Sequence, residues 1–106
     1  MNRVVRPYRV PLTGATRVKL ELASNSVLLG VSAASKALNI FVEEPLDVQN
    51  RHVRNFAIIR SLEAFDRTDR WEFIGTADFG GVESYHVYQV PTPDLEERRR
   101  AELGFS

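Results

Sequence analysis

Hydrophobic and polar residues alternate along most of this chain with the period of two that is typical of half-buried β-strands. The pattern is clearest in residues 71–79 and 82–90, which are rich in aromatic and β-branched residues and flank Gly80-Gly81. Both glycines can adopt positive φ at no steric cost, as a two-residue hairpin turn requires. The sequence therefore predicts a β-hairpin over residues 71–90.

A two-residue turn also predicts which side chains of this hairpin share a face, because side chains alternate along each strand. We expect one face to be dry and to line the core, since it carries most of the aromatic rings. It contains the cross-strand pairs Phe79 with Val82, Ala77 with Ser84, Gly75 with His86, Phe73 with Tyr88 and Trp71 with Val90.

The opposite face of the predicted hairpin mixes apolar and polar side chains. Ile74 pairs with Val87 and Thr76 with Tyr85, whereas Asp78 and Glu83 place like charges near the turn. We therefore expect this face to be partly covered by a partner. Its apolar patch is formed by Ile74, Tyr85 and Val87.

The first third of the chain predicts two further strands. Residues 4–12 contain Pro7 and Pro11, each of which removes a backbone donor, so an extended arm or an edge strand is expected. Val18, Leu20 and Leu22 then alternate with charged residues, which indicates a half-buried strand.

A second hairpin is predicted over residues 27–42, with a polar turn near Ser35-Lys36. The strict alternation places one set of apolar side chains on a shared face across the two strands. This set consists of Val27, Leu29, Val31, Ala33, Leu38, Ile40 and Val42.

Residues 53–65 are compatible with either a strand or a helix. Phe56 and Ile58 alternate with Asn55 and Ala57, as in a strand, but Phe56, Ile59, Leu62 and Phe65 also recur at helical spacing. Periodicity alone does not separate the two. The strand-rich surroundings favour a strand for at least the first half.

The character of the sequence changes after Val90. Pro91 and Pro93 end the sheet, and Asp94 with Glu97 three residues later forms a capping box for a helix over 95–103. Such a short helix is marginal in water, and its apolar residues do not form one stripe. We therefore expect the tail to be held by a partner through Leu95, Leu103 and Phe105.

Composition limits the possible classes of function. The chain has 106 residues, 14 basic and 14 acidic side chains and no cysteine. This balance gives no electrostatic footprint for nucleic acid or an anionic membrane, and the lack of cysteine excludes disulfides and thiolate chemistry. Because no apolar run approaches a membrane span and the N-terminus lacks an apolar signal segment, we expect a soluble intracellular protein.

These observations predict an all-β fold, a small antiparallel sandwich or partly open barrel of about six or seven strands, with a short C-terminal helical arm. Residues 1–91 are expected to form one β domain, in which residues 1–12 are an extended arm or edge strand. Residues 92–106 are expected to form the helical tail.

Several short motifs resemble a family of small phage and prophage proteins of unknown function. They are the aromatic-Ile-Gly-Thr run at 73–76, the His-Val-aromatic run at 86–88, the aromatic-Pro-Leu arm at 8–12 and the central hairpin at 27–45. The resemblance implies a β fold and a phage origin, hence a location in the virion or the host bacterial cytoplasm. It implies no catalytic residue, and the chain departs from the family pattern at 60–63.

His86 is the residue most suited to a catalytic role. It is a possible general base in the opening left by Gly75, but a catalytic histidine needs a nucleophile or an orienting partner within reach. Ser84 lies on the same face about 7 Å away along the strand, which is too far. We therefore expect His86 to cover the bare backbone of Gly75.

No other group predicts a catalytic or metal site. The acidic residues Asp66, Asp69, Asp78 and Glu83 lack the dense ligand spacing of a calcium loop, so we expect no metal and no cofactor. His52 is expected at the surface. The run 98–100 of three arginines is flanked by glutamates that cancel its field.

The sequence thus predicts a protein that is not an enzyme. The favoured interpretation is a phage-encoded interaction or structural accessory module that self-associates as a homo-oligomer or joins a larger assembly such as a virion. The alternative is a small-ligand or host-factor binder that counters bacterial defence, with a site at Trp71, His86 and Tyr88. A third hypothesis is an esterase-like or metal-dependent enzyme that uses His86.

Overall fold

Seven β-strands and their connecting loops make up the described residues 2–14, 16–47 and 50–91 of the computed structural model, which contain no helix. This confirms the all-β prediction, and no helix capable of crossing a membrane is found in that part of the chain. The helix predicted over 95–103 and its anchors Leu95, Leu103 and Phe105 lie outside the described residues. The strands are β1 (Arg3–Pro11), β2 (Arg17–Ala23), β3 (Val27–Ala34), β4 (Ala37–Pro45), β5 (Arg51–Arg60), β6 (Glu72–Phe79) and β7 (Glu83–Val90).

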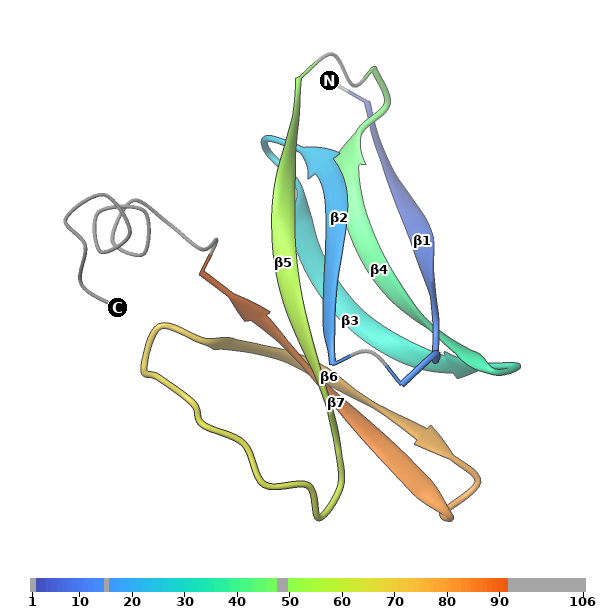
Figure 1. The fold of residues 1–106 in the computed structure, drawn as a ribbon. Helices are drawn as coiled ribbons and strands as arrows, with labels where there is room; N and C mark the ends of the chain where they lie inside the picture. Colours follow the sequence, from blue (N-terminus) through green and yellow to red (C-terminus); the bar gives the residue numbers. More distant parts are fainter. Residues whose placement is uncertain (1, 15, 48–49, 92–106) are drawn as a thin grey trace, which may run out of the picture.

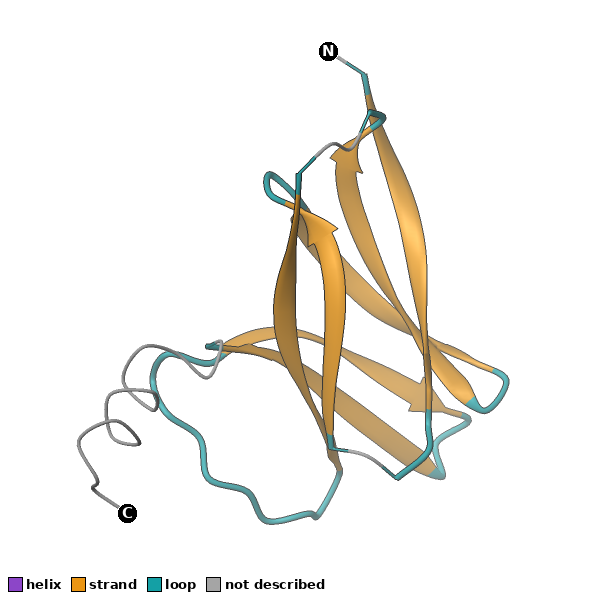
Figure 2. Cartoon of the chain, turned by 45° about the horizontal axis from the view of Figure 1, so that its top comes forward, coloured by secondary structure: helices purple, strands orange, loops and turns teal. Residues whose placement is uncertain are grey.

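The strands form two antiparallel sheets (Figures 1 and 2). The three-stranded sheet has the order β1-β4-β3, and the four-stranded sheet has the order β2-β5-β7-β6. β1 is an edge strand, as its two prolines predict. The fold is therefore an open sandwich, not a closed barrel.

β5 organises the four-stranded sheet because its two ends pair with different neighbours. Residues Arg51 to Ala57 pair with β2, and residues Asn55 to Arg60 pair with β7. The strand ends at Arg60 and a loop follows, so the helical alternative for residues 53–65 is wrong. Residues 55–59 are buried throughout, because both faces of β5 are covered.

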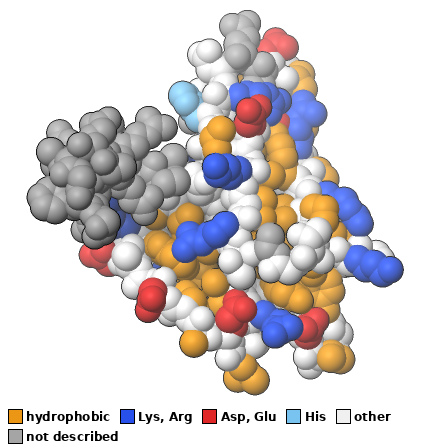
Figure 3. All heavy atoms as spheres, in the orientation of Figure 1, with side chains coloured by type: hydrophobic (Ala, Val, Ile, Leu, Met, Phe, Trp, Pro, Cys, Tyr) orange, Lys and Arg blue, Asp and Glu red, His pale blue; other side chains and the backbone are white. Residues whose placement is uncertain are grey.

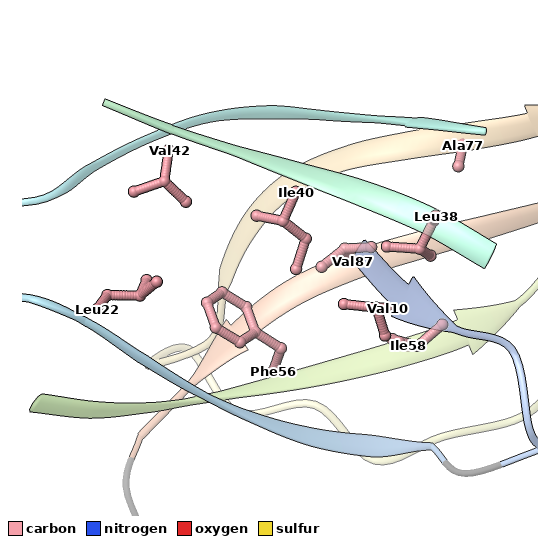
Figure 4. Close-up of a cluster of buried hydrophobic side chains, with 9 residues drawn as sticks. All are labelled: Val10, Leu22, Leu38, Ile40, Val42, Phe56, Ile58, Ala77 and Val87. Atoms are coloured by element: carbon pink, nitrogen blue, oxygen red, sulfur yellow. The ribbon is translucent and has the colours of Figure 1, made fainter. Parts of the chain in front are cut away.

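An aliphatic core fills the space between the two sheets. Its buried members come from every strand except β3, which contributes the partly buried Leu28 and Val31. Figure 4 shows these side chains pointing toward one another from the two sheets. The buried members are Val10, Leu22, Leu38, Ile40, Val42, Phe56, Ile58, Ala77 and Val87.

The hairpin β3–β4 has the predicted turn at Ser35-Lys36, but a bulge at Leu29 changes its face pattern. Leu28 pairs with Val42 and Gly30 with Phe41, so the strand gains one residue between them. The prediction that Val27 and Leu29 share a face with Val31 is wrong, because both are about half exposed, whereas Val31 and Leu28 pack against the core.

The hairpin β6–β7 also contains a bulge, and this overturns the predicted register. Phe73 pairs with Tyr88 as expected, but Gly75 pairs with Val87, so Ile74 is the extra residue. Phe79 then pairs with Glu83, and the turn is a three-residue loop in which Gly80 and Gly81 have φ of 68° and 78°.

The bulge splits the face that the sequence placed wholly in the core. Ala77 and Phe79 pack into the core between the sheets, whereas Trp71 and Phe73 lie on the opposite side of the sheet. The physical reason is that one inserted residue reverses the side-chain alternation beyond it.

The two bulges lie against each other, since Gly75 of β6 contacts Gly30 and Val31 of β3. A Cβ added at Gly75 would lie 3.1 Å from Val31 Cγ2 and 3.3 Å from the Val31 backbone nitrogen, with Gly30 Cα next at 3.7 Å. A side chain at position 75 would therefore require Val31 to move, which favours glycine at this close approach of two strands.

A carboxylate lies at the inner face of β4, in line with the core. Glu44 is fully buried, and its side chain accepts hydrogen bonds from the Tyr8 hydroxyl at 2.9 and 3.0 Å and pairs with Arg6 Nε at 2.7 Å. Hydrogen bonding to Tyr8 and the charge of Glu44 raise the pKa of the neighbouring Arg51 above its ordinary value. The buried charge is therefore compensated, as a stable fold requires.

Candidate functional site

The site lies on the outer face of the four-stranded sheet, the face turned away from the three-stranded sheet. Alternation along β5 directs Phe56 and Ile58 into the core and Ala57 and Ile59 to the outer face. The other described residues of this face come from β2, β6 and β7 and from the connection between β5 and β6.

Four aromatic rings form a contiguous group on this face, which we call the aromatic cluster and which consists of Phe65, Trp71, Phe73 and Tyr88. Phe65 stacks on Trp71 at a centroid distance of 5.7 Å and an interplanar angle of 17°. Tyr88 lies 5.7 Å from Trp71 and 5.4 Å from Phe73, the latter edge-on. These are favourable aromatic geometries.

Two guanidinium groups cover parts of the aromatic cluster. Arg17 Cζ lies 4.8 Å from the ring centroid of Trp71, and Arg67 Cζ lies 4.9 Å from that of Tyr88. Arg67 also donates a hydrogen bond to the Trp71 carbonyl at 3.4 Å. The cluster is held by cation–π contacts as well as by ring contacts.

The aromatic cluster is only partly buried. Trp71 is 8% exposed, but Phe65 is 41% and Phe73 is 51% exposed. A hollow of about 350 Å³ adjoins Trp71 and Phe65, with Arg17, Glu63 and Asp66 also in its wall. The surface thus offers large rings beside side chains of both charges.

His86 lies beside the aromatic cluster and is hydrogen-bonded at both ring nitrogens. Thr76 Oγ1 lies 2.9 Å from Nδ1 and Ser61 Oγ lies 2.9 Å from Nε2. The predicted pairing of His86 with Gly75 is wrong, because the bulge at Ile74 brings Thr76 opposite His86. The imidazole therefore bridges two hydroxyl groups and does not cover bare glycine backbone.

Ser61 occupies a tight turn that follows β5. The Glu63 N–H donates to the Arg60 carbonyl at 3.0 Å, and the Ser61 N–H donates to the Ser84 carbonyl at 3.0 Å. Leu62 has φ of 70°, a conformation that is uncommon for a residue with a side chain. The turn is thus tied to β7, the strand that carries His86.

The hairpin tip is arranged differently from the sequence prediction. Asp78 Oδ1 accepts hydrogen bonds from the Gly81 N–H at 3.0 Å and the Ser84 hydroxyl at 3.3 Å. The register shift separates Asp78 from Glu83, which pairs with Arg60 at 3.5 Å, so the expected pairing of like charges is wrong. No group of three metal-ligating side chains occurs among the described residues.

The apolar patch predicted from Ile74, Tyr85 and Val87 lies on the inner side of the sheet. Val87 is fully buried, and the other two pack against the same core. Packing between the sheets of one chain therefore accounts for their apolar character. Burial, and then the Glu83 carboxylate to which its hydroxyl donates at 3.3 Å, raise the pKa of Tyr85.

Three of the residues predicted from sequence are brought together on the outer face, namely Trp71, His86 and Tyr88. Sequence reasoning missed Ser61 and Thr76 as partners of His86, and missed Phe65 as a member of the aromatic cluster. The isolated glycine at position 75 was the available signal, since glycine within a strand pattern is typical of a bulge. His52 is exposed, as predicted, and the arginines at 98–100 lie outside the described residues.

Comparison with known proteins gives a family and no function. Residues 1–98 match the family described as a domain of unknown function (DUF7352). No curated protein and no solved structure matches the chain significantly. The match covers both sheets and every residue of the outer face, and the phage origin implied by the resemblance stays a prediction.

Proposed function

We propose that this chain, which belongs to the DUF7352 family of domains of unknown function, is a non-enzymatic protein-interaction module that binds through the aromatic cluster. The observation that carries the proposal is the half-exposed pair of rings, Phe65 and Phe73, at the margin of a packed aromatic group. Aromatic residues and arginine are the side chains most enriched at the energetic centres of protein interfaces.

The partner we propose is a second copy of this chain. The hollow beside the aromatic cluster has Arg17 together with Glu63 and Asp66 in its wall, so charges of both signs border the same rings. In the space-filling view, basic and acidic side chains both lie beside exposed hydrophobic ones (Figure 3). A two-fold interface places a patch against itself, so such a border pairs arginine of one copy with carboxylates of the other.

The net charge supports the same partner. Fourteen basic and fourteen acidic side chains give a formal net charge of zero, so two copies approach without mutual repulsion. In a phage setting, the self-associated module would be an accessory of a larger assembly such as a virion.

Sedimentation velocity over a range of protein concentrations tests this proposal. We expect a concentration-dependent dimer, and Phe73→Ser to raise its dissociation constant by at least about tenfold, the usual effect of losing a hot-spot side chain. Val82→Ser is the matched control, because Val82 is 88% exposed at the hairpin tip outside the aromatic cluster.

Two results would contradict the proposal. A wild-type chain that sediments as a monomer at every concentration excludes the second copy. A dimer that Phe73→Ser leaves intact, while Val82→Ser weakens it, moves the interface away from the aromatic cluster.

A second candidate function is the binding of a small ligand, and the hollow of about 350 Å³ beside Trp71 favours it. Trp71 and Phe65 supply aromatic walls, and Glu63, Asp66 and Arg17 supply polar groups, as in many ligand sites. A co-purifying small molecule that raises the melting temperature of the wild type, but not of Trp71→Ala, supports this candidate.

A further inference from the structure

We propose that Ser61 is a nucleophilic serine that accepts acyl groups from activated esters or thioesters. His86 is its general base, and Thr76 is the residue that orients His86. The inference goes beyond the proposed interaction function and does not depend on it, and one acylation per chain without turnover is compatible with a non-enzymatic module. It rests on the two 2.9 Å contacts that connect the three side chains.

The order of the three side chains matches what a serine nucleophile requires. With the ring proton on Nδ1, His86 donates to Thr76 Oγ1, and its unprotonated Nε2 accepts the hydrogen bond of the Ser61 hydroxyl. The Thr76 hydroxyl can accept this proton, and in this tautomer the basic nitrogen is directed at the nucleophile. Ser84, the other serine of this face, is hydrogen-bonded to Asp78 instead.

The backbone holds Ser61 in this position independently of its side chain. The Ser61 N–H is bonded to the Ser84 carbonyl of β7, and the turn closes through Glu63 and Arg60. Leu62 keeps its uncommon φ of 70° although its side chain is fully exposed and packs on nothing. Backbone strain of this kind, without packing to explain it, is a feature of functional turns.

Ser61 is exposed, so an acyl donor reaches its hydroxyl without any opening of the fold. In the transfer, Ser61 Oγ bonds to the carbonyl carbon of the donor as its proton passes to His86 Nε2. The bond from that carbon to the leaving oxygen or sulfur then breaks. The leaving group takes the proton from His86, giving acyl-Ser61 and a free alcohol or thiol.

p-Nitrophenyl acetate is a suitable probe, because it carries a good leaving group and its product absorbs light. We expect one equivalent of p-nitrophenolate per chain, with the acetyl group on Ser61 in a peptide map of the intact protein. Ser61→Ala removes the hydroxyl of an exposed residue and leaves the backbone hydrogen bonds in place, so it folds and loses this acetylation. Ser84→Ala is the matched control and keeps it.

Variants of the other two residues separate the roles. His86→Gln is expected to slow acetylation of Ser61 by at least about 100-fold, the lower range for loss of a general base. Thr76→Val, which keeps the shape but lacks the acceptor, is expected to slow it, and Thr76→Ser is expected to restore the rate. A purely structural role for Thr76 would not produce that rescue.

Three results overturn the proposal. One is acetylation of Lys19, Lys36 or the N-terminus in place of Ser61. Another is an unchanged rate in Ser61→Ala. The third is a folded His86→Gln protein, verified by its melting temperature, that is acetylated at Ser61 as fast as the wild type.

Discussion

The two faces of the four-stranded sheet are built from the same strands but are covered in different ways. The inner face carries Phe56, Ile58 and Val87 against the other sheet, and all three are buried. The outer face carries Trp71, Phe73 and Tyr88, and the described groups that pack over these rings are Phe65 of a loop and two guanidinium groups. The inner face is thus closed within one chain, whereas the outer face leaves rings at the surface.

This difference separates stability from interaction. Aliphatic side chains enclosed on all sides contribute through the apolar area removed from water and through close packing. Rings that are half exposed contribute less to folding and keep apolar area available for a partner. The inner face therefore holds the fold together, and the outer face is the part of the sheet free to act.

The largest expected effect comes from the inner face. Phe56→Ala removes a fully buried ring from the core and should lower the free energy of unfolding by about 3–5 kcal/mol. Phe73→Ala removes a half-exposed ring from the outer face and should cost about 1 kcal/mol, the value of its aromatic contacts. Urea unfolding followed by tryptophan fluorescence measures both, and equal losses would remove the distinction between the faces.

An intermediate effect is expected at the bulge that divides the two faces. Gly75→Ala places a methyl group 3.1 Å from Val31 Cγ2 and 3.3 Å from its backbone nitrogen, and should cost about 1–3 kcal/mol. Val31→Ala removes only the first of these contacts. In a double-mutant cycle, part of the cost should therefore be recovered, because the backbone contact persists.

A gain of stability in Gly75→Ala would contradict the close approach of the two sheets. Gly30→Ala is a useful comparison, because its added Cβ meets nothing within 4 Å but its φ is 156°. That variant should be destabilised through its backbone conformation alone, and Val31→Ala should not rescue it.

The smallest expected effect concerns Tyr85 on the inner face. Its pKa is raised above the ordinary value near 10, so the unfolded chain releases this proton at lower pH than the folded protein does. Stability should therefore be unaffected below about pH 10 and should decline as the pH rises above it. Urea unfolding of the wild type and of Tyr85→Phe at neutral and alkaline pH measures this effect. The part of the loss of stability that is due to Tyr85 should be absent from the variant.

Strand existence was predictable from sequence because alternation and turn residues are local signals. The sequence predicted both hairpins, around Ser35-Lys36 and Gly80-Gly81. It also predicted that the proline-containing strand β1 lies at a sheet edge. The face assignments failed across the bulges at Leu29 and Ile74, because one extra residue in a strand reverses the side-chain alternation between its two sides. An isolated strand glycine indicates a bulge, but it does not say which neighbour is the inserted residue.

The candidate site was predictable only in part for a related reason. Trp71, His86 and Tyr88 were placed on one face because β6 pairs with β7 through a short loop. Ser61 reaches His86 only because β5 pairs with β7 across about 25 positions of sequence, a long-range pairing that periodicity does not encode. The loop that follows β5 also places Phe65 on Trp71, a contact that periodicity likewise does not encode.

The buried carboxylate of Glu44 makes the opening residues of the chain indispensable. Its counter-charge and its hydroxyl donor, Arg6 and Tyr8, both come from the edge strand β1, which is made well before β4 leaves the ribosome. A polypeptide shortened to start at Arg9 would keep the acid but lose its ion-pair partner and its hydroxyl donor. Trimming from this end therefore does more than remove an edge, since it takes away the ion pair and the hydrogen bonds of a buried carboxylate.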